Sequence, residues 1–290
     1  MKKFNRVYIN GSSLSCGGSL NYKSKAWEHY VKECGITEWD DSKKVSYGNV
    51  LAKMLNAEAI NEAKEGGGLD RLIRKTYDFI SNSSLSELNE TIFVFDIPLQ
   101  PARFEVYSKE YNDWFVVAVA YNGMGGNSIT KIEISRDDET WESNLSFSRD
   151  FFDSKLFLSL EETKKHDKLL NEFVDAYYDY EVQTNRLLRE LTMFYCFLDK
   201  MGIHYFRDNN ETIFAGSVNF QKREAANDLI EKLKLFESSN PNIINSPTIW
   251  NLSEKKGWRL VDESPIDDAH LGYYGNIKYA EYLYKKIENS

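Results

Sequence analysis

The sequence has few cysteines, and none of them lie close together. Cys16, Cys34 and Cys196 are its three cysteines, and no two of them form a C-x-x-C pair. Structural zinc sites are typically built from such pairs, and disulfide frameworks from an even number of cysteines. The cysteine pattern therefore argues against a zinc–thiolate site and favours a reducing compartment.

Long apolar segments and runs of basic residues are also missing. No stretch approaches the roughly 18 consecutive apolar residues of a membrane-spanning helix. The start, MKKFNRVYINGSS, lacks the apolar segment of about 7 residues or more that a secretory signal requires. With a formal net charge of −9 and no basic run to neutralise phosphates, the chain is not expected to bind nucleic acid. We expect a cytoplasmic protein that does not act at a membrane.

Short apolar segments alternate with helical patterns along the chain. Residues 4–10, 57–63 and 91–97 have the pattern of buried strands. Apolar residues at three- and four-residue steps predict helices over residues 24–34, 47–55, 69–80, 160–201, 222–236 and 273–287. This alternation predicts a three-layer α/β/α fold with a central parallel sheet, of the flavodoxin-like kind. We predict a single domain spanning residues 1–290.

The middle of the chain departs from this alternation. Residues 114–121 and 129–135 are strand-like and are separated by the turn-rich sequence NGMGGN. We predict that these two segments pair with each other as a β-hairpin. The hairpin would belong to an insertion over residues 107–160, followed by the helical segment.

The two ends of the chain carry the residues suited to nucleophilic catalysis. Ser13 follows the first strand, where open α/β sheets present the crevice that binds ligands. Asp267 and His270 precede the last helix, and a serine hydroxyl needs a base that is oriented by an acid. A serine in a Gly/Ser loop is more often a turn residue, and Asp-x-x-His more often a solvated loop. The hypothesis therefore depends on the two signals together.

Three segments resemble the sequence blocks of the SGNH/GDSL hydrolases. Gly11-Ser12-Ser13-Leu14-Ser15 resembles the GDSL block, and Asp267-Asp268-Ala269-His270 resembles the closing DxxH block. Between them, Asn61-x-Ala63-x-x-Gly66-x-x-x-Asp70-Arg71-x-Ile73-Arg74 resembles the second block and is the most specific of the three. Two departures stand out: Ser12 replaces the aspartate of GDSL, and the GxND block is absent.

The resemblance implies a role for each of these positions. Ser13 would be the nucleophile, His270 its base and Asp267 the acid that orients the base. The amides of Ser13 and Gly66 would bind the oxyanion. Gln100 lies where the family has the asparagine of GxND, so its side-chain amide could also donate to the oxyanion. Arg103, in the segment Pro101-Ala102-Arg103-Phe104-Glu105, would help to bind the substrate.

The resulting hypothesis is a serine esterase that acts through an acyl-enzyme, without a cofactor or a metal. Its partner would be a small-molecule or carbohydrate ester, such as an O-acetylated sugar. One alternative is a catalytically degenerate protein of the same fold that binds or has a structural role. The other is a carbohydrate-binding module, since aromatic residues make up 14% of the chain.

Replacement of Gln100 tests the assignment that departs furthest from the family pattern. Gln100→Ala should lower kcat about tenfold or more and change KM less, because an oxyanion contact strengthens only as the charge develops. Steady-state hydrolysis of a short acyl ester measures both constants. An unchanged kcat would leave only the two backbone amides as donors.

Overall fold

The computed structural model describes residues 4–17, 43–97, 100–120, 129–145, 158–208, 243–246, 256 and 271–288. Its core is a five-stranded sheet in which all neighbouring strands are parallel and lie in the order β2-β1-β3-β8-β9. The strands are β1 (Arg6–Asn10), β2 (Glu58–Asn61), β3 (Thr91–Phe95), β8 (Tyr205–Asp208) and β9 (Ile243–Ser246). This is the 2-1-3-4-5 order of flavodoxin-like folds, so the predicted three-layer class is confirmed.

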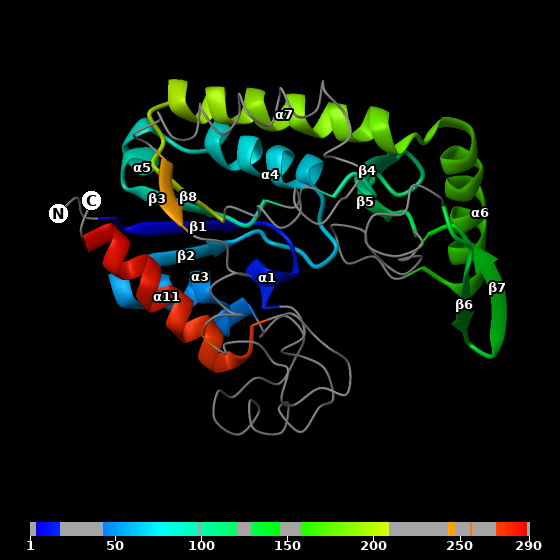
Figure 1. Cartoon of the computed structure of the whole chain (residues 1–290), viewed down its shortest axis with the longest axis horizontal. Helices are drawn as coiled ribbons and strands as arrows, with labels where there is room; N and C mark the ends of the chain where they lie inside the picture. Colours follow the sequence, from blue (N-terminus) through cyan, green and yellow to red (C-terminus); the bar gives the residue numbers. More distant parts are fainter. Residues whose placement is uncertain are drawn as a thin grey trace.

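Helices cover both faces of the sheet (Figure 1). One face carries α4 (Leu69–Ser81), α5 (Leu85–Asn89) and α7 (Tyr180–Lys200). The other carries α3 (Tyr47–Leu55) and α11 (Tyr273–Glu288). The helices predicted for residues 24–34 and 222–236 lie outside the described residues. No helix of the described ranges is both long and apolar enough to cross a membrane.

Side chains of the central strands alternate between the two helical layers. Tyr8, Phe93 and Phe95 belong to the core beneath α4 and α7. Val7, Ile9, Ile92 and Val94, one residue out of step, belong to the core beneath α3 and α11. Because successive side chains of a strand point to opposite faces, an uninterrupted apolar run is buried on both sides. This explains why β1 and β3 could be predicted from apolar runs alone.

A second, smaller core lies beyond the carboxyl ends of the strands (Figure 1). It contains two antiparallel hairpins and the helix α6 (Leu160–Tyr177). In the first hairpin β4 (Arg103–Ser108) pairs with β5 (Asp113–Ala118), and in the second β6 (Ile132–Arg136) pairs with β7 (Glu139–Ser143). A bridge between Val119 and Leu145 joins the two hairpins.

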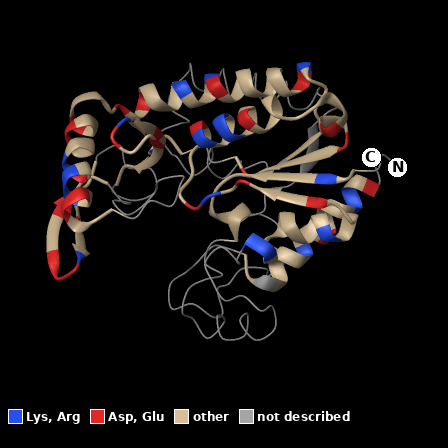
Figure 2. Ribbon diagram, turned by 180° about the vertical axis from the view of Figure 1, so that it is seen from behind, with Lys and Arg blue, Asp and Glu red and all other residues tan. Residues whose placement is uncertain are grey.

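The predicted hairpin between residues 114–121 and 129–135 is therefore wrong in its pairing. The turn of the second hairpin is Asp137-Asp138, an acidic tip far from the sheet (Figure 2), and both residues have positive φ, 50° and 66°. Positive φ at both central residues is the type I′ geometry that suits a two-residue hairpin loop. This two-residue turn is enough to pair β6 with β7, the strand that follows it in the chain.

The buried face of α6 also differs from the predicted one by a single residue. The spacing of Leu169 and Phe173 suggests that these two side chains face the core, but both are exposed by 40% or more, at 53% and 41%. Leu170 and Val174, one position later, are buried against the hairpins. Two overlapping apolar stripes on one helix cannot be ranked without knowing where the hairpins lie.

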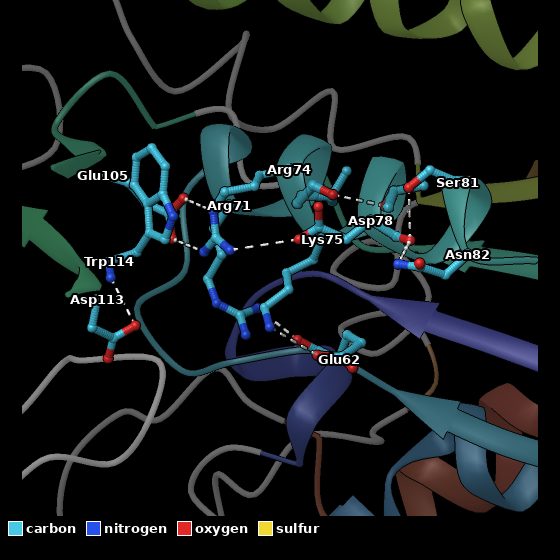
Figure 3. Close-up of polar contacts among 12 residues, drawn as sticks. Glu62, Arg71, Arg74, Lys75, Asp78, Ser81, Asn82, Glu105, Asp113 and Trp114 are labelled. Atoms are coloured by element: carbon cyan, nitrogen blue, oxygen red, sulfur yellow. Dashed lines mark hydrogen bonds and ion pairs between the residues drawn. The ribbon is translucent and has the colours of Figure 1, made fainter. Parts of the chain in front are cut away.

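Helix α4 anchors the first hairpin through a charged contact. Arg74 donates two hydrogen bonds to Glu105, Nε to Oε2 at 2.9 Å and Nη2 to Oε1 at 2.7 Å. The same guanidinium lies over the ring of Trp114, 4.8 Å from its centroid (Figure 3). Arg186 of α7 donates in turn to Asp70, whose carboxylate accepts the Glu105 amide at 3.4 Å. The hairpin is thus fixed to the helical layer over the sheet.

Arg74→Met should destabilise the protein strongly. The side chain of Glu105 is 2% exposed, and leaving a buried carboxylate without its partner costs about 3 kcal/mol or more. Urea unfolding gives the free energy. As a control, Lys131→Met breaks an ion pair whose side chains are 68% and 71% exposed, and should cost less than about 1 kcal/mol. Equal losses in the two variants would contradict the anchoring role.

Candidate active site

The candidate site lies where the chain changes direction in the sheet. After β1 the chain crosses to β2 on one side, and after β3 it continues to β8 on the other. Ligands of open α/β sheets bind at the carboxyl ends of the two strands that flank such a switch point. Gly11 to Ser13 follow β1, and Asp96 follows β3.

Asp96 and Ser12 join the ends of these two strands. The Ser12 amide and hydroxyl both donate to Asp96 Oδ2, at 3.2 and 2.7 Å. Gly11, the residue before Ser12, has a φ of 154°, and a Cβ at this position would lie 2.5 Å from the Asp96 carbonyl oxygen. Only glycine allows the two strand ends to come this close. No element of the sequence analysis pointed to Asp96.

The three serines of this loop differ in exposure. Ser12 is buried and bound to Asp96, and Ser15 is buried with its hydroxyl 2.6 Å from that of Tyr47. Ser13, the first residue of the short helix α1 (Ser13–Cys16), is half-exposed. Among these three serines, the predicted nucleophile is therefore the one that is not buried.

The loop that follows β2 packs against the loop that follows β1, at the carboxyl ends of the two strands. The Lys64 amide donates to the Gly11 carbonyl at 3.2 Å. Gly66 is buried and has a φ of 74°, a conformation that other residues rarely adopt. At Gly67 a Cβ would lie 3.4 Å from the Gly11 carbonyl oxygen. The predicted oxyanion donor, Gly66, thus belongs to a loop packed against the residues that precede Ser13.

Arg103 reaches the same region from the first hairpin. Its carbonyl oxygen would lie 2.9 Å from a Cβ at Gly68, so the hairpin also packs against the loop that follows β2. Burial lowers the pKa of the Arg103 guanidinium, while the nearby carboxylates of Asp96 and Glu65 act in the opposite direction. An arginine remains charged in proteins even so. The site therefore contains a shielded positive charge.

The charged residues of the second block have structural partners. Arg71 donates to the Glu62 carbonyl oxygen at 2.5 Å, and Arg74 binds Glu105 (Figure 3). Asn61 donates to the Ser15 carbonyl oxygen at 3.1 Å and so ties this loop to α1. These contacts explain why the block contains those residue types. Gly66 is the member of the block that is left with a predicted chemical role.

The start of α11 is held beside the same loop. The Tyr47 amide donates to Asn276 Oδ1 at 2.8 Å, and the Asn276 amide group donates to the carbonyls of Leu271 and Gly272. Leu271 and Leu14 belong to one buried apolar cluster. Tyr47, whose hydroxyl also contacts that of Ser15, therefore connects α1, α3 and α11.

The remaining predicted site residues are placed only in part. Asp267 and His270 lie outside the described residues. Gln100 is half-buried, and its carbonyl oxygen accepts the Arg103 amide at 2.9 Å. Ser13, Gly66 and Arg103 thus belong to three segments that meet at the carboxyl ends of the strands. Within the described ranges no three His, Cys, Asp or Glu side chains gather as a metal site would require.

Comparison with known proteins gives similarity in structure alone. No family model and no curated protein matches the sequence. A lipolytic protein of the G-D-S-L family from Desulfitobacterium hafniense DCB-2 matches with 9% identity and a TM-score of 0.36, over 97% of this chain and 99% of its own. A carbohydrate esterase, described as displaying divergent catalytic and non-catalytic binding functions, matches with 12% identity and a TM-score of 0.36. That match covers 100% of this chain and 66% of the esterase.

Replacement of Gly11 tests the close approach between β1 and β3. Gly11→Ala adds a Cβ 2.5 Å from the Asp96 carbonyl oxygen, at a φ of 154°. Gly202 also has a positive φ, but a Cβ there meets nothing within 4 Å. Gly202→Ala should therefore cost only the backbone strain, about 1 to 2 kcal/mol of unfolding free energy. Gly11→Ala should cost about 1 to 3 kcal/mol more, because its Cβ also collides with Asp96. Equal losses of unfolding free energy would contradict this packing.

Proposed function

We propose that the protein is a serine esterase that hydrolyses short acyl esters through an acyl-enzyme formed on Ser13. The observation that carries this proposal is the position of Ser13. Ser13 is a half-exposed residue of a loop at the switch point, whereas Ser12 and Ser15 in the same loop are buried. A nucleophile needs such access on a rigid support.

The base of the proposed mechanism is His270. Its neighbour in the chain, Leu271, shares a buried cluster with Leu14, the neighbour of Ser13. Adjacent Cα atoms are about 3.8 Å apart, so each proposed catalytic residue is one step from a residue of that cluster. The proposal requires the His270 imidazole to lie within hydrogen-bond reach of the Ser13 hydroxyl. Asp267, three residues before His270, would orient its imidazole.

The chemical steps follow from these roles. Ser13 Oγ attacks the carbonyl carbon of the ester while His270 accepts the hydroxyl proton. The carbon–oxygen bond to the alcohol then breaks, and the alcohol leaves with that proton. Water attacks the acyl-enzyme in the same manner and releases the acid. The amides of Ser13 and Gly66, with the side chain of Gln100, would bind the oxyanion.

The proposed substrate is a small molecule or a carbohydrate that carries an acyl ester. Arg103 supports this choice because a shielded positive charge that interacts with Asp96 could also bind a polar or negatively charged group of the substrate. Proteins of this kind need no cofactor for the reaction. We propose no nucleic-acid or membrane partner, because the formal net charge is −9 and the sequence has no long basic or apolar run.

A fluorophosphonate probe should label Ser13. Such probes lose fluoride as a serine oxygen bonds to phosphorus, and mass spectrometry of the digested protein locates the adduct. Ser13→Ala should abolish labelling and lower kcat for p-nitrophenyl acetate by roughly 10⁴-fold or more. Ser15→Ala is the matched control: it removes a buried hydroxyl contact worth about 1 kcal/mol and should leave labelling intact.

Failure of this experiment has a definite meaning. A folded protein with no adduct on Ser13 and no hydrolysis would contradict the esterase proposal. The replacement of the GDSL aspartate by Ser12 would then favour a degenerate protein that binds without catalysis. Binding of acetylated and unmodified oligosaccharides, measured for the native protein and for Ser13→Ala, distinguishes that case.

A further inference from the structure

The carboxylate of Asp96 is fully enclosed at the centre of the proposed site. The residue is 1% exposed, and its own amide donates to the Asn10 carbonyl oxygen at 3.1 Å. A buried carboxylate is costly unless hydrogen bonds and charges compensate it. Ser12 supplies two hydrogen bonds, and the positive charge of Arg103 lies close enough to interact with it. The protein therefore places an acidic side chain where an apolar one would cost less.

Every polar group of Ser12 has a partner in this arrangement. The amide and the hydroxyl donate to Asp96, and the carbonyl oxygen accepts the Cys16 amide at 3.2 Å. These contacts fix the backbone of Ser12 at φ −98° and ψ −152°. Because ψ of Ser12 sets the plane of the peptide that it shares with Ser13, they also fix the direction of the Ser13 amide.

We propose that Asp96 is the positioning residue of Ser13 and supplies, from β3, the carboxylate that the GDSL pattern would place at position 12. Ser12 connects the two: its hydroxyl is the right length to reach a carboxylate on the neighbouring strand. The inference rests on the proposed function, because Asp96 acts on the reaction only through Ser12 and Ser13. It predicts that the carboxyl group of Asp96 matters for turnover more than for substrate binding.

The strand beneath Ser12 is held in the same way. Asn10 donates from its side-chain amide to the hydroxyls of Tyr8 and Thr76 and to the Leu72 carbonyl oxygen, at 3.0 to 3.1 Å. Its Oδ1 accepts the Gly11 amide at 2.9 Å. The Asn10 hydrogen bonds hold the end of β1, and Asp96 holds Ser12. Together these contacts leave the loop little freedom to reorient. A residue that positions a nucleophile needs such a support.

Asp96→Asn, Ser12→Ala and Tyr47→Phe test this assignment. Asp96→Asn should lower kcat for p-nitrophenyl acetate by about 10- to 100-fold with KM changed less than about threefold, because a small misplacement of a reacting group is enough for such a loss. Ser12→Ala keeps Asp96 beside Arg103 and should lower kcat less. Tyr47→Phe removes an equally buried hydroxyl contact to Ser15 and should leave kcat within about threefold of the native value.

A spectroscopic measurement separates this inference from the proposed function. The native Ser12 amide, bonded to a carboxylate, should give a downfield proton resonance that shifts upfield in Asp96→Asn and stays in Tyr47→Phe. An unshifted Ser12 resonance, or a kcat unchanged in folded Asp96→Asn, would overturn the assignment. If native protein neither reacts with fluorophosphonate nor hydrolyses ester but the resonance shifts, the esterase proposal fails and Asp96 remains the residue that orders Ser12.

Discussion

The close contact between the ends of β1 and β3 is the constraint on which the rest of the site depends. Both strands lie at the middle of the sheet and bury apolar side chains on both faces, which fixes their register. That register places Asn10 beside Phe95, and therefore Gly11 and Ser12 beside Asp96. The glycine allows the approach, and the carboxylate holds the loop. Ser13, one residue further on, is presented to solvent by packing that is otherwise purely structural.

The parts of the fold that local patterns determine were predictable from the sequence. Apolar runs located β1 and β3, and three- and four-residue spacing located α3, α4 and α11. The strand β4 could not be predicted from the sequence, because two of its side chains, Arg103 and Glu105, are charged. Their interactions depend on α4 and Asp96, which are distant in the sequence or in another element. The pairing of the hairpins could not be predicted either, because the dipeptide Asp137-Asp138 is a weaker turn signal in the sequence than the glycine-rich NGMGGN.

The loops that carry two of the candidate residues could be predicted because each motif has a fixed position relative to a strand. Ser13 and Gly66 were placed in loops after β1 and β2, and the structure has both loops in contact at the sheet edge. Asp96 could not be found in this way: in the sequence it is one polar residue at the end of an apolar run. Its role follows only from the pairing of β1 with β3, which brings together residues 84 positions apart in the chain.

The central claim is that Ser13 carries an acyl group during turnover. The most direct test mixes the protein with p-nitrophenyl acetate, quenches with acid within one turnover and maps any acetyl group by mass spectrometry. The account predicts a burst of nitrophenol equal to the enzyme concentration and an acetyl group on Ser13. Hydrolysis without a burst together with an unmodified Ser13, or an acetyl group on another residue, would contradict it.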